Sequence, residues 1–223
     1  MCRIVAVETT NPKDIEMVFK ALMRAAEYDH IAAKFMSPKD ADGWGFAIYA
    51  GGKAITYRTG TPIYQDEKRL PDLTGHESER IYAVFHTRRD TWIKFPLLRS
   101  RGQRETYVCS NGAVFTGKLM DHSLNSVFLT INKKTKEAGI SYQNFFRIST
   151  RFKSKDLYEA KNEYFEMYER KLPEGGRIIM SSTLAKELGG EKIVKNRSKL
   201  QSIMTMAYLC TQLFRPKAMK SWD

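Results

Sequence analysis

The chain of 223 residues lacks several features that would assign it to a special class of protein. It has no run of about 18 apolar residues, so we expect no membrane-spanning helix. Its start lacks the basic and apolar segments of a secretory signal. Its three cysteines, Cys2, Cys109 and Cys210, form neither a disulfide framework nor a CxxC metal site. These absences predict a cytoplasmic protein that is not bound to a membrane and needs no metal and no cofactor.

What the sequence has in excess is positive charge. The net charge is +12, and residues 111–223 hold +9 of it, with 20 Lys and Arg against 11 Asp and Glu. Such a half could attract nucleic acid, anionic lipid or an acidic protein. No nucleic-acid-binding motif accompanies the charge, so we favour a solvated surface and do not expect nucleic acid as a partner.

The hydrophobic pattern predicts a mixture of strands and helices. A short apolar strand follows Cys2, and Asn11-Pro12 is typical of a helix start. Gly51-Gly52 between two apolar segments predicts a β-hairpin. The expected strands are 3–8, 46–50, 54–58, 81–86, 106–110 and 177–182, the expected helices are 15–26, 154–171 and 200–214, 127–131 fits either a strand or a helix start, and 99–104 reads as a loop. This order indicates one α+β domain over residues 1–223, with antiparallel sheet packed against helices.

Cys2 is the residue with the clearest chemical potential. Removal of Met1 would make it the first residue, with a free α-amine whose ordinary pKa is about 7.7–8.0. That amine could accept the proton of the Cys2 thiol near neutral pH, so no catalytic histidine would be needed. Taken alone, a cysteine here more often just begins a strand.

Three other segments carry groups of the right kind. Arg88 follows an apolar strand, where a guanidinium can bind a carboxylate through two hydrogen bonds, although most arginines are simply exposed. Asn111-Gly112 could offer a side-chain amide and a backbone N–H to one oxyanion, although this pair more often forms a turn. Asp42-Gly43-Trp44-Gly45 could position a loop beside the Cys2 strand, or form an ordinary turn.

Taken together, these segments resemble the class II glutamine amidotransferases, which are N-terminal nucleophile hydrolases. The resemblance is greatest to the small stand-alone members and covers about the first 130 residues. Met1-Cys2-Arg3 matches the family's start, Asp42–Phe46 its Asp-Gly-Trp-Gly-apolar segment, Phe85–Arg88 its Ala-His-x-Arg segment and Asn111-Gly112 its His-Asn-Gly segment. Residues 177–183 look like a late strand of the same proteins.

The resemblance implies a fold, a reaction and a site. The fold would be a four-layer αββα sandwich. Cys2 would attack the side-chain amide of glutamine or a γ-glutamyl compound, forming a thioester and releasing ammonia. Asn111 and Gly112 would stabilise the oxyanion, and Arg88 would bind the substrate carboxylate with help from Thr91. The ammonia would pass to a separate synthase subunit or be released.

The sequence departs from the family pattern at several positions. Ser110 replaces the histidine before Asn-Gly, and Asn125 occupies the place of the aspartate that binds the substrate α-amine. Asp121 lies close enough in sequence to substitute for it. Loss of that carboxylate would weaken a charge-assisted contact of about 1.5–3 kcal/mol. A catalytically inactive binding or regulatory protein that keeps the fold therefore stays open as the alternative.

Overall fold

The computed structural model describes residues 2–34, 37–66, 70–76, 79–89, 98–100, 104–113, 122–147, 163 and 166–193, with the backbone alone at 98–100, 110–113, 122–124 and 144–147. These residues belong to the first of two compact units, Met1–Ile193; the second is Val194–Asp223. The helix expected over 200–214 thus lies outside the described residues, and the single-domain organisation stays a prediction.

The described helices and strands follow one another along the chain in the order β1 (Arg3–Thr9), α1 (Pro12–Glu27), β2 (Trp44–Ala50), β3 (Lys53–Thr59), β4 (Ile81–Thr87), β5 (Leu98–Ser100), β6 (Arg104–Ala113), β7 (His122–Asn132), β8 (Ala138–Arg147), β9 (Met167–Lys171), β10 (Arg177–Ser181), α3 (Ser182–Leu188) and β11 (Glu191–Lys192). Short 3₁₀ helices span Ala32–Lys34, Thr74–His76 and Pro173–Gly175. The described part of the chain is therefore mixed, mostly strand with two α-helices.

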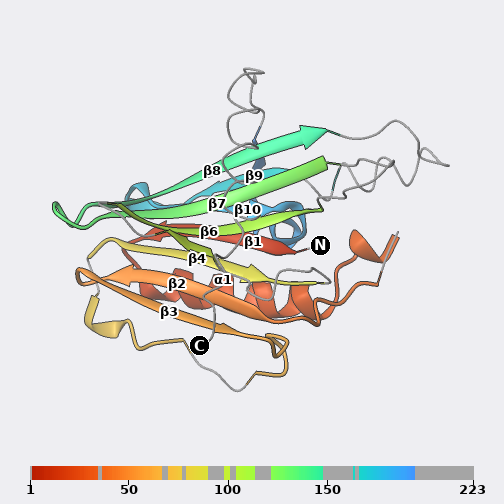
Figure 1. The fold of residues 1–223 in the computed structure, drawn as a ribbon, viewed down its shortest axis with the longest axis horizontal. Coiled ribbons are helices and arrows are strands. Elements are labelled where there is room, and N and C mark those ends of the chain that lie inside the picture. The colour runs from red at the N-terminus through yellow and green to blue at the C-terminus, as the bar shows by residue number, and fades with distance from the viewer. Residues whose placement is uncertain are drawn as a thin grey trace, which may run out of the picture. The chain divides into compact units, whose positions relative to one another are not determined.

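The strands form two antiparallel sheets (Figure 1). The first has seven strands in the order β11-β9-β10-β1-β4-β2-β3, and the second has four in the order β5-β6-β7-β8. One buried cluster joins α1 and α3 to one face of the first sheet, and another joins its opposite face to the second sheet. The described elements thus form three layers, helix, sheet and sheet, and the four-layer sandwich stays a prediction.

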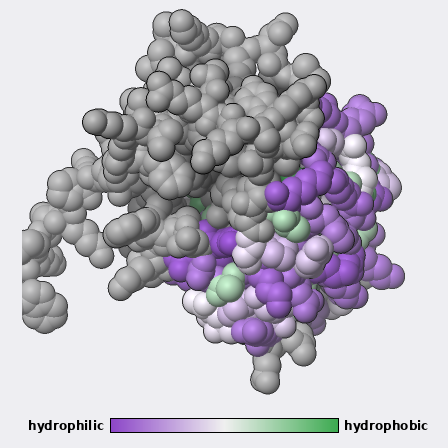
Figure 2. All heavy atoms as spheres, turned by 90° about the vertical axis from the view of Figure 1, so that its right-hand side faces the viewer, coloured by the Kyte–Doolittle hydropathy of each residue, from purple (hydrophilic) through white to green (hydrophobic). Residues whose placement is uncertain are grey.

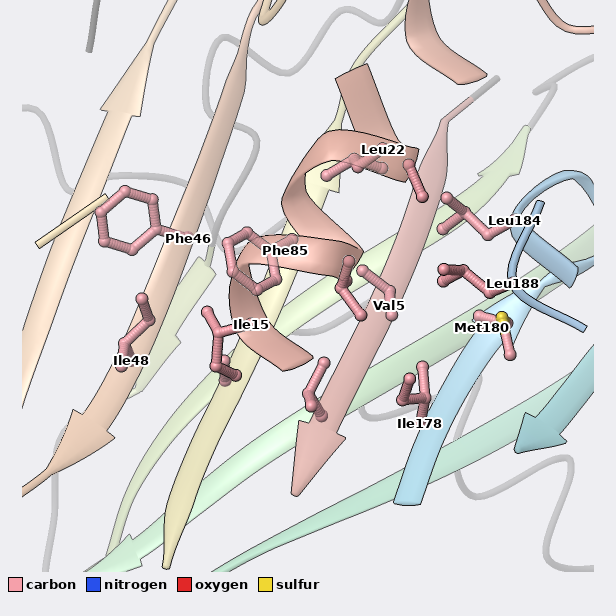
Figure 3. Close-up of a cluster of buried hydrophobic side chains, with 14 of the residues drawn as sticks. Val5, Ile15, Leu22, Phe46, Ile48, Phe85, Ile178, Met180, Leu184 and Leu188 are labelled. Carbon is pink, nitrogen blue, oxygen red and sulfur yellow. The ribbon is translucent and has the colours of Figure 1, made fainter. Parts of the chain in front are cut away.

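Strand β1 lies between β4 and β10 near the middle of the first sheet, and both of its faces are covered. Val5 and Val7 contact the helical layer, whereas Ile4 and Ala6 contact the second sheet. Figure 3 shows the helical side, where α1, α3 and the strands contribute closely packed aliphatic and aromatic side chains. Burial on both faces explains the uninterrupted apolar run after Arg3.

Helix α1 begins where the sequence predicts. The Asn11 side chain accepts a hydrogen bond from the backbone N–H of Lys13 at 3.1 Å, and Pro12 occupies the first turn. Buried residues recur at helical spacing over Ile15–Ala26 and face the first sheet.

The hairpin prediction is also confirmed, because β2 and β3 pair around Gly51 (φ 55°) and Gly52 (φ 73°). Two successive positive φ values are those of the two-residue turn that glycine favours.

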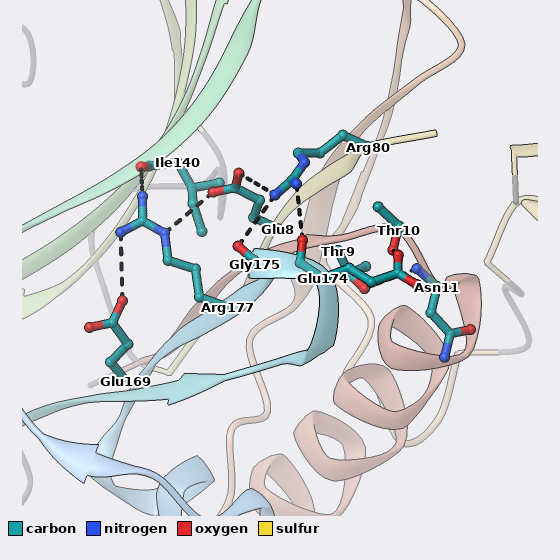
Figure 4. A network of polar contacts seen from close by, with 10 residues as sticks. All are labelled: Glu8, Thr9, Thr10, Asn11, Arg80, Ile140, Glu169, Glu174, Gly175 and Arg177. Atoms are coloured by element: carbon teal, nitrogen blue, oxygen red, sulfur yellow. Dashed lines mark hydrogen bonds and ion pairs between the residues drawn. The ribbon is translucent and has the colours of Figure 1, made fainter. Parts of the chain in front are cut away.

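A polar network lies at the end of β1 remote from Cys2 (Figure 4). Arg177 contacts Glu8 at 3.3 Å and donates to the backbone oxygen of Ile140 in β8 at 3.0 Å, so it connects the two sheets. Arg80 binds the same carboxylate at 3.0 Å. Because these side chains are partly exposed, each ion pair is worth at most about 1 kcal/mol.

Two expectations from the sequence were wrong. Residues 167–171, expected to end a helix over 154–171, form β9 between β10 and β11. Met167 is buried between the sheets, so tertiary packing overrides the helix propensity of the segment. Residue 163 is helical, and the rest of the expected helix lies outside the described residues.

The segment 99–104 is not wholly loop, because β5 covers 98–100 and β6 starts at Arg104. The open choice at 127–131 resolves as strand, within β7.

The described surface is mainly hydrophilic on the face drawn in Figure 2, with only small green areas. Among the described residues the exposed large apolar side chains are Tyr28 and Ile55. No helix in the described part of the chain combines the length and the apolar character needed to cross a membrane.

Gly43 is the glycine whose replacement we expect to harm the fold most. Its φ is +112°, and an added Cβ would lie 2.2 Å from the backbone oxygen of Thr59. Gly43→Ala should lower the free energy of unfolding by about 3 kcal/mol, measured by urea titration. Gly52→Ala is the matched control, since φ is +73° but nothing lies within 4 Å; its cost should be about 1–2 kcal/mol. Equal losses would contradict this account.

Candidate active site

Three strand ends meet beside Cys2. Arg3 at the start of β1 pairs with Thr87 at the end of β4, and Thr87 also pairs with Trp44 at the start of β2. The backbone continues this contact beyond the strands: the N–H of Arg88 donates to the Gly43 oxygen at 2.8 Å. Three of the four segments that carry the family resemblance, far apart in sequence, therefore lie together at one end of the first sheet.

The Cys2 thiol lies in the interior. Cys2 is not part of a disulfide, has 2% of its surface exposed and accepts a hydrogen bond from the backbone N–H of Arg89. Burial raises the pKa of the Cys2 thiol and the Asp40 carboxylate adds to the rise, while the Arg89 N–H and the Arg3 guanidinium oppose it. The thiol at rest is therefore protonated near neutral pH.

The second sheet approaches Cys2 through β6. Cys109 is fully buried, and burial together with the nearby Cys2 charge raises its pKa well above the ordinary value. Asn111 and Gly112 follow on the same strand, where they pair with Asn125 and Leu124 of β7. Asn111-Gly112 is thus part of a strand and does not form the turn in which this dipeptide most often occurs.

Of the four expected substrate-binding residues, two lie in the described part of the chain. Arg88 lies half-buried directly after β4, and Asn125 is completely buried in β7, opposite the backbone of Asn111. The structure therefore brings Arg88 to the Cys2 end of the first sheet and Asn125 to the strand beside Asn111. Thr91 and Asp121 lie outside the described residues, so their roles stay predictions.

Arg3 is the largest buried polar side chain among the described residues, and its role was not predicted from the sequence. It is 1% exposed, lies 2.7 Å from Asp29, forms a second ion pair with Asp40 and donates to the Pro38 oxygen at 3.2 Å. The sequence did contain a signal for this role: a charged residue begins a strand that is buried on both faces. Such a charge needs a buried partner of opposite charge. The positions of both aspartates in loops hid that partner.

Both aspartates are themselves held by threonine hydroxyls. Thr87 donates to Asp40 at 2.5 Å, and Thr183 donates to Asp29 at 2.7 Å. Asp29 also accepts from the backbone N–H of Ile31. Burial raises the pKa of Asp40, and the neighbouring Arg3 guanidinium and the Thr87 hydrogen bond oppose that rise.

His86 is the histidine of the His-x-Arg segment, and it is buried on β4 opposite Ile4. Burial, with the positive charge of Arg88 nearby, lowers the pKa of His86 from 6.5 to about 3. The imidazole is therefore neutral at physiological pH and does not serve as a charged acid there.

No group of three or more His, Cys, Asp or Glu side chains in the described part of the chain could hold a metal ion. The expected independence from a metal stays a prediction.

Comparison of the chain with protein-family models and with curated proteins gives no match.

We expect Arg3→Met to destabilise the fold severely, because it leaves the Asp29 and Asp40 carboxylates buried without a counter-charge. The free energy of unfolding should fall by about 3–5 kcal/mol in urea titration. The triple variant that adds Asp29→Asn and Asp40→Asn should recover much of the loss, since no buried charge then stays uncompensated. A triple variant as unstable as the single one would show that shape, and not charge, explains the effect.

His86 should make stability depend on pH. Above pH 6.5 the imidazole is neutral in both the folded and the unfolded chain. Below pH 6.5 the unfolded chain binds a proton at His86, whereas the folded chain binds it only near pH 3. Stability should therefore fall with decreasing pH by up to about 1.4 kcal/mol per unit from this residue. Urea titrations of the wild type and His86→Gln between pH 4 and 7 should show a shallower slope for the variant. Parallel slopes would contradict a neutral buried imidazole.

Proposed function

We propose that the protein is an amidohydrolase of the N-terminal nucleophile type, which releases ammonia from glutamine or a γ-glutamyl compound. The observation that carries the proposal is the meeting of β1, β2 and β4 at Cys2. This supports the proposal because the motifs otherwise have only their order in the sequence to connect them.

The first chemical step is attack by Cys2. Once Met1 is removed, the free α-amine accepts the thiol proton while sulfur bonds to the carbonyl carbon of the substrate amide. The carbonyl oxygen becomes negative and is stabilised by the Asn111 side-chain amide and the Gly112 backbone N–H. The amine then returns its proton to the leaving nitrogen, the C–N bond breaks and ammonia departs. Water hydrolyses the γ-glutamyl thioester in the second half of the reaction.

Substrate recognition rests on Arg88 and Asn125. The Arg88 guanidinium binds the substrate α-carboxylate, with Thr91 as its helper. Asn125 or Asp121 accepts from the α-amine. The described residues offer support at two points, since Arg88 lies beside the β2 start and Asn125 lies opposite Asn111.

The second candidate is a binding or regulatory protein without catalysis. The neutral, fully buried Asn125 favours it, because the family uses a carboxylate for the substrate amine. It predicts retained binding of glutamine without turnover, so the two functions differ in a measurable product.

Cys2→Ala should reduce ammonia release from L-glutamine by about a thousandfold or more, because it removes the nucleophile. A coupled ammonia assay on protein whose intact mass shows loss of Met1 is the measurement. Cys109→Ala is the matched control: it removes the neighbouring buried thiol and should keep most of the activity. Wild-type protein that has lost Met1 and binds glutamine but releases no ammonia would favour the second candidate.

A further inference from the structure

Ser181 carries a buried hydroxyl whose oxygen has no hydrogen-bond partner among the described residues. The residue is 2% exposed and is the last of β10, immediately before α3. A serine at a helix start commonly accepts from a backbone N–H of the first turn, but Ser181 makes no such bond. Because an unpaired buried hydroxyl costs stability, it needs an explanation outside the packing of the fold.

The Ser181 side chain faces the second sheet. It lies opposite Met167 of β9, which belongs to the buried cluster between the two sheets, and directly opposed side chains share one face of a sheet. The preceding residue, Met180, lies on the helical side, as Figure 3 shows, in agreement with alternation along a strand. Ser181 is therefore on the same side of the first sheet as Ile4, and Cys2 shares the parity of Ile4 along the chain.

The register of the strands places Ser181 near Cys2. Strands β1 and β10 are antiparallel, and their last pair at this end joins Val5 to Met180. One step further, Ser181 comes beside Ile4, and Cys2 lies two residues before Ile4. Diagonal neighbours of this kind are about 7–8 Å apart, which is too far for a direct hydrogen bond. A water molecule that bonds to both side chains spans about 6 Å, so the spacing suits a bridging water.

Buried contacts on the helical side hold the same two segments together. Arg3, which follows Cys2, and Thr183, two residues after Ser181, bind one oxygen of Asp29, each at 2.7 Å. None of these three binding side chains is more than 6% exposed. The start of β1 and the end of β10 are therefore fixed side by side, and this contact does not depend on the register of the strands.

The second half of the proposed reaction needs a water molecule close to the Cys2 sulfur. After ammonia leaves, the γ-glutamyl carbonyl carbon is bonded to that sulfur, and water takes the place of the departed nitrogen. The water oxygen bonds to the carbon while one of its protons passes to the α-amine. The C–S bond then breaks, and the amine returns the proton to sulfur. A fixed hydroxyl that hydrogen-bonds the water holds its oxygen toward the carbon, which favours attack.

We infer that Ser181 binds and orients the water molecule that hydrolyses the Cys2 thioester. This inference rests on the proposed function, because it assigns a residue to the second half of that reaction. It accounts for a hydroxyl that is buried without a partner in the described structure, since the partner arrives with the reaction. The cost of the unpaired group is then the cost of a site prepared for water.

Ser182 offers a matched control. It is the next residue and is also 2% exposed, but it is the first residue of α3, and its backbone N–H donates to the Glu166 oxygen at 3.1 Å. Ser181→Ala and Ser182→Ala thus remove the same hydroxyl from neighbouring buried positions. A general effect of altering this end of β10 would appear in both variants.

The test uses protein that has lost Met1, with L-glutamine as the substrate. In Ser181→Ala, kcat should fall about tenfold and kcat/KM, which reports acylation, should change less than about twofold. Intact mass spectra of quenched reactions should show the γ-glutamyl thioester accumulating on Cys2. Ser182→Ala should accumulate none. An unchanged kcat in Ser181→Ala, or equal accumulation in the two variants, would overturn the inference.

Hydroxylamine separates water binding from other effects. It attacks the thioester in place of water and forms the γ-glutamyl hydroxamate, and as a stronger nucleophile it depends less on being oriented. Hydroxamate formation by Ser181→Ala should therefore stay within about twofold of wild type. A loss of hydroxamate as large as the loss of hydrolysis would contradict a role confined to water.

Stability gives an independent readout. Ser181→Ala removes a hydroxyl without a described partner, so its unfolding midpoint in urea should be no lower than that of wild type. A lower midpoint would show a structural hydroxyl and would count against the inference. Ammonia release with equal behaviour of the two serine variants contradicts this inference alone. Wild-type protein that has lost Met1 and forms neither thioester nor ammonia contradicts the proposed function, and this inference with it.

Discussion

The ion-pair cluster around Arg3 is the constraint on which the Cys2 end of the molecule depends. A guanidinium in the interior loses its hydration, and this loss is tolerable only with partners of opposite charge in good geometry. Asp29 and Asp40 supply them from the segment between α1 and β2, and Thr87 connects the cluster to β4. The first residues of β1 are therefore fixed to two other parts of the chain. An N-terminal nucleophile needs this, because a chain terminus otherwise frays.

Alternation along β1 separates the buried charges from the Cys2 thiol. Residues of odd number, such as Arg3 and Val5, face the helical layer, whereas Ile4 and Ala6 face the second sheet. Cys2 shares the parity of the second group, and it lies close enough to Cys109 of β6 to help raise the pKa of the Cys109 thiol. Consecutive residues thus place the cluster and the thiol on opposite sides of one sheet. The Asp40 charge on one side acts on the Cys2 thiol through the electrostatic field, and it raises the pKa of that thiol.

The sequence predicted elements whose signals are local. The cap at Asn11, the Gly51-Gly52 turn and the apolar run of β1 each depend on residues within a few positions, and the structure confirms them. The sequence could not reveal which aspartates pair with Arg3, because those contacts span 26 and 37 positions and follow no periodicity. The error at 167–171 has a related cause: Met167 fits a helical pattern, but partners distant in sequence place it in a strand.

The position of Asn-Gly within β6 affects how the proposed site would choose its substrate. A strand fixes the backbone N–H of Gly112 more firmly than a turn does, which favours a preorganised oxyanion site. Opposite it, the amide of Asn125 can accept from a substrate amine but adds no ionic attraction. Selectivity for free glutamine over derivatives without an α-ammonium would then be smaller than with a carboxylate there. Arg88 would carry most of the recognition, because charge-assisted bonds are roughly twice as strong as neutral ones.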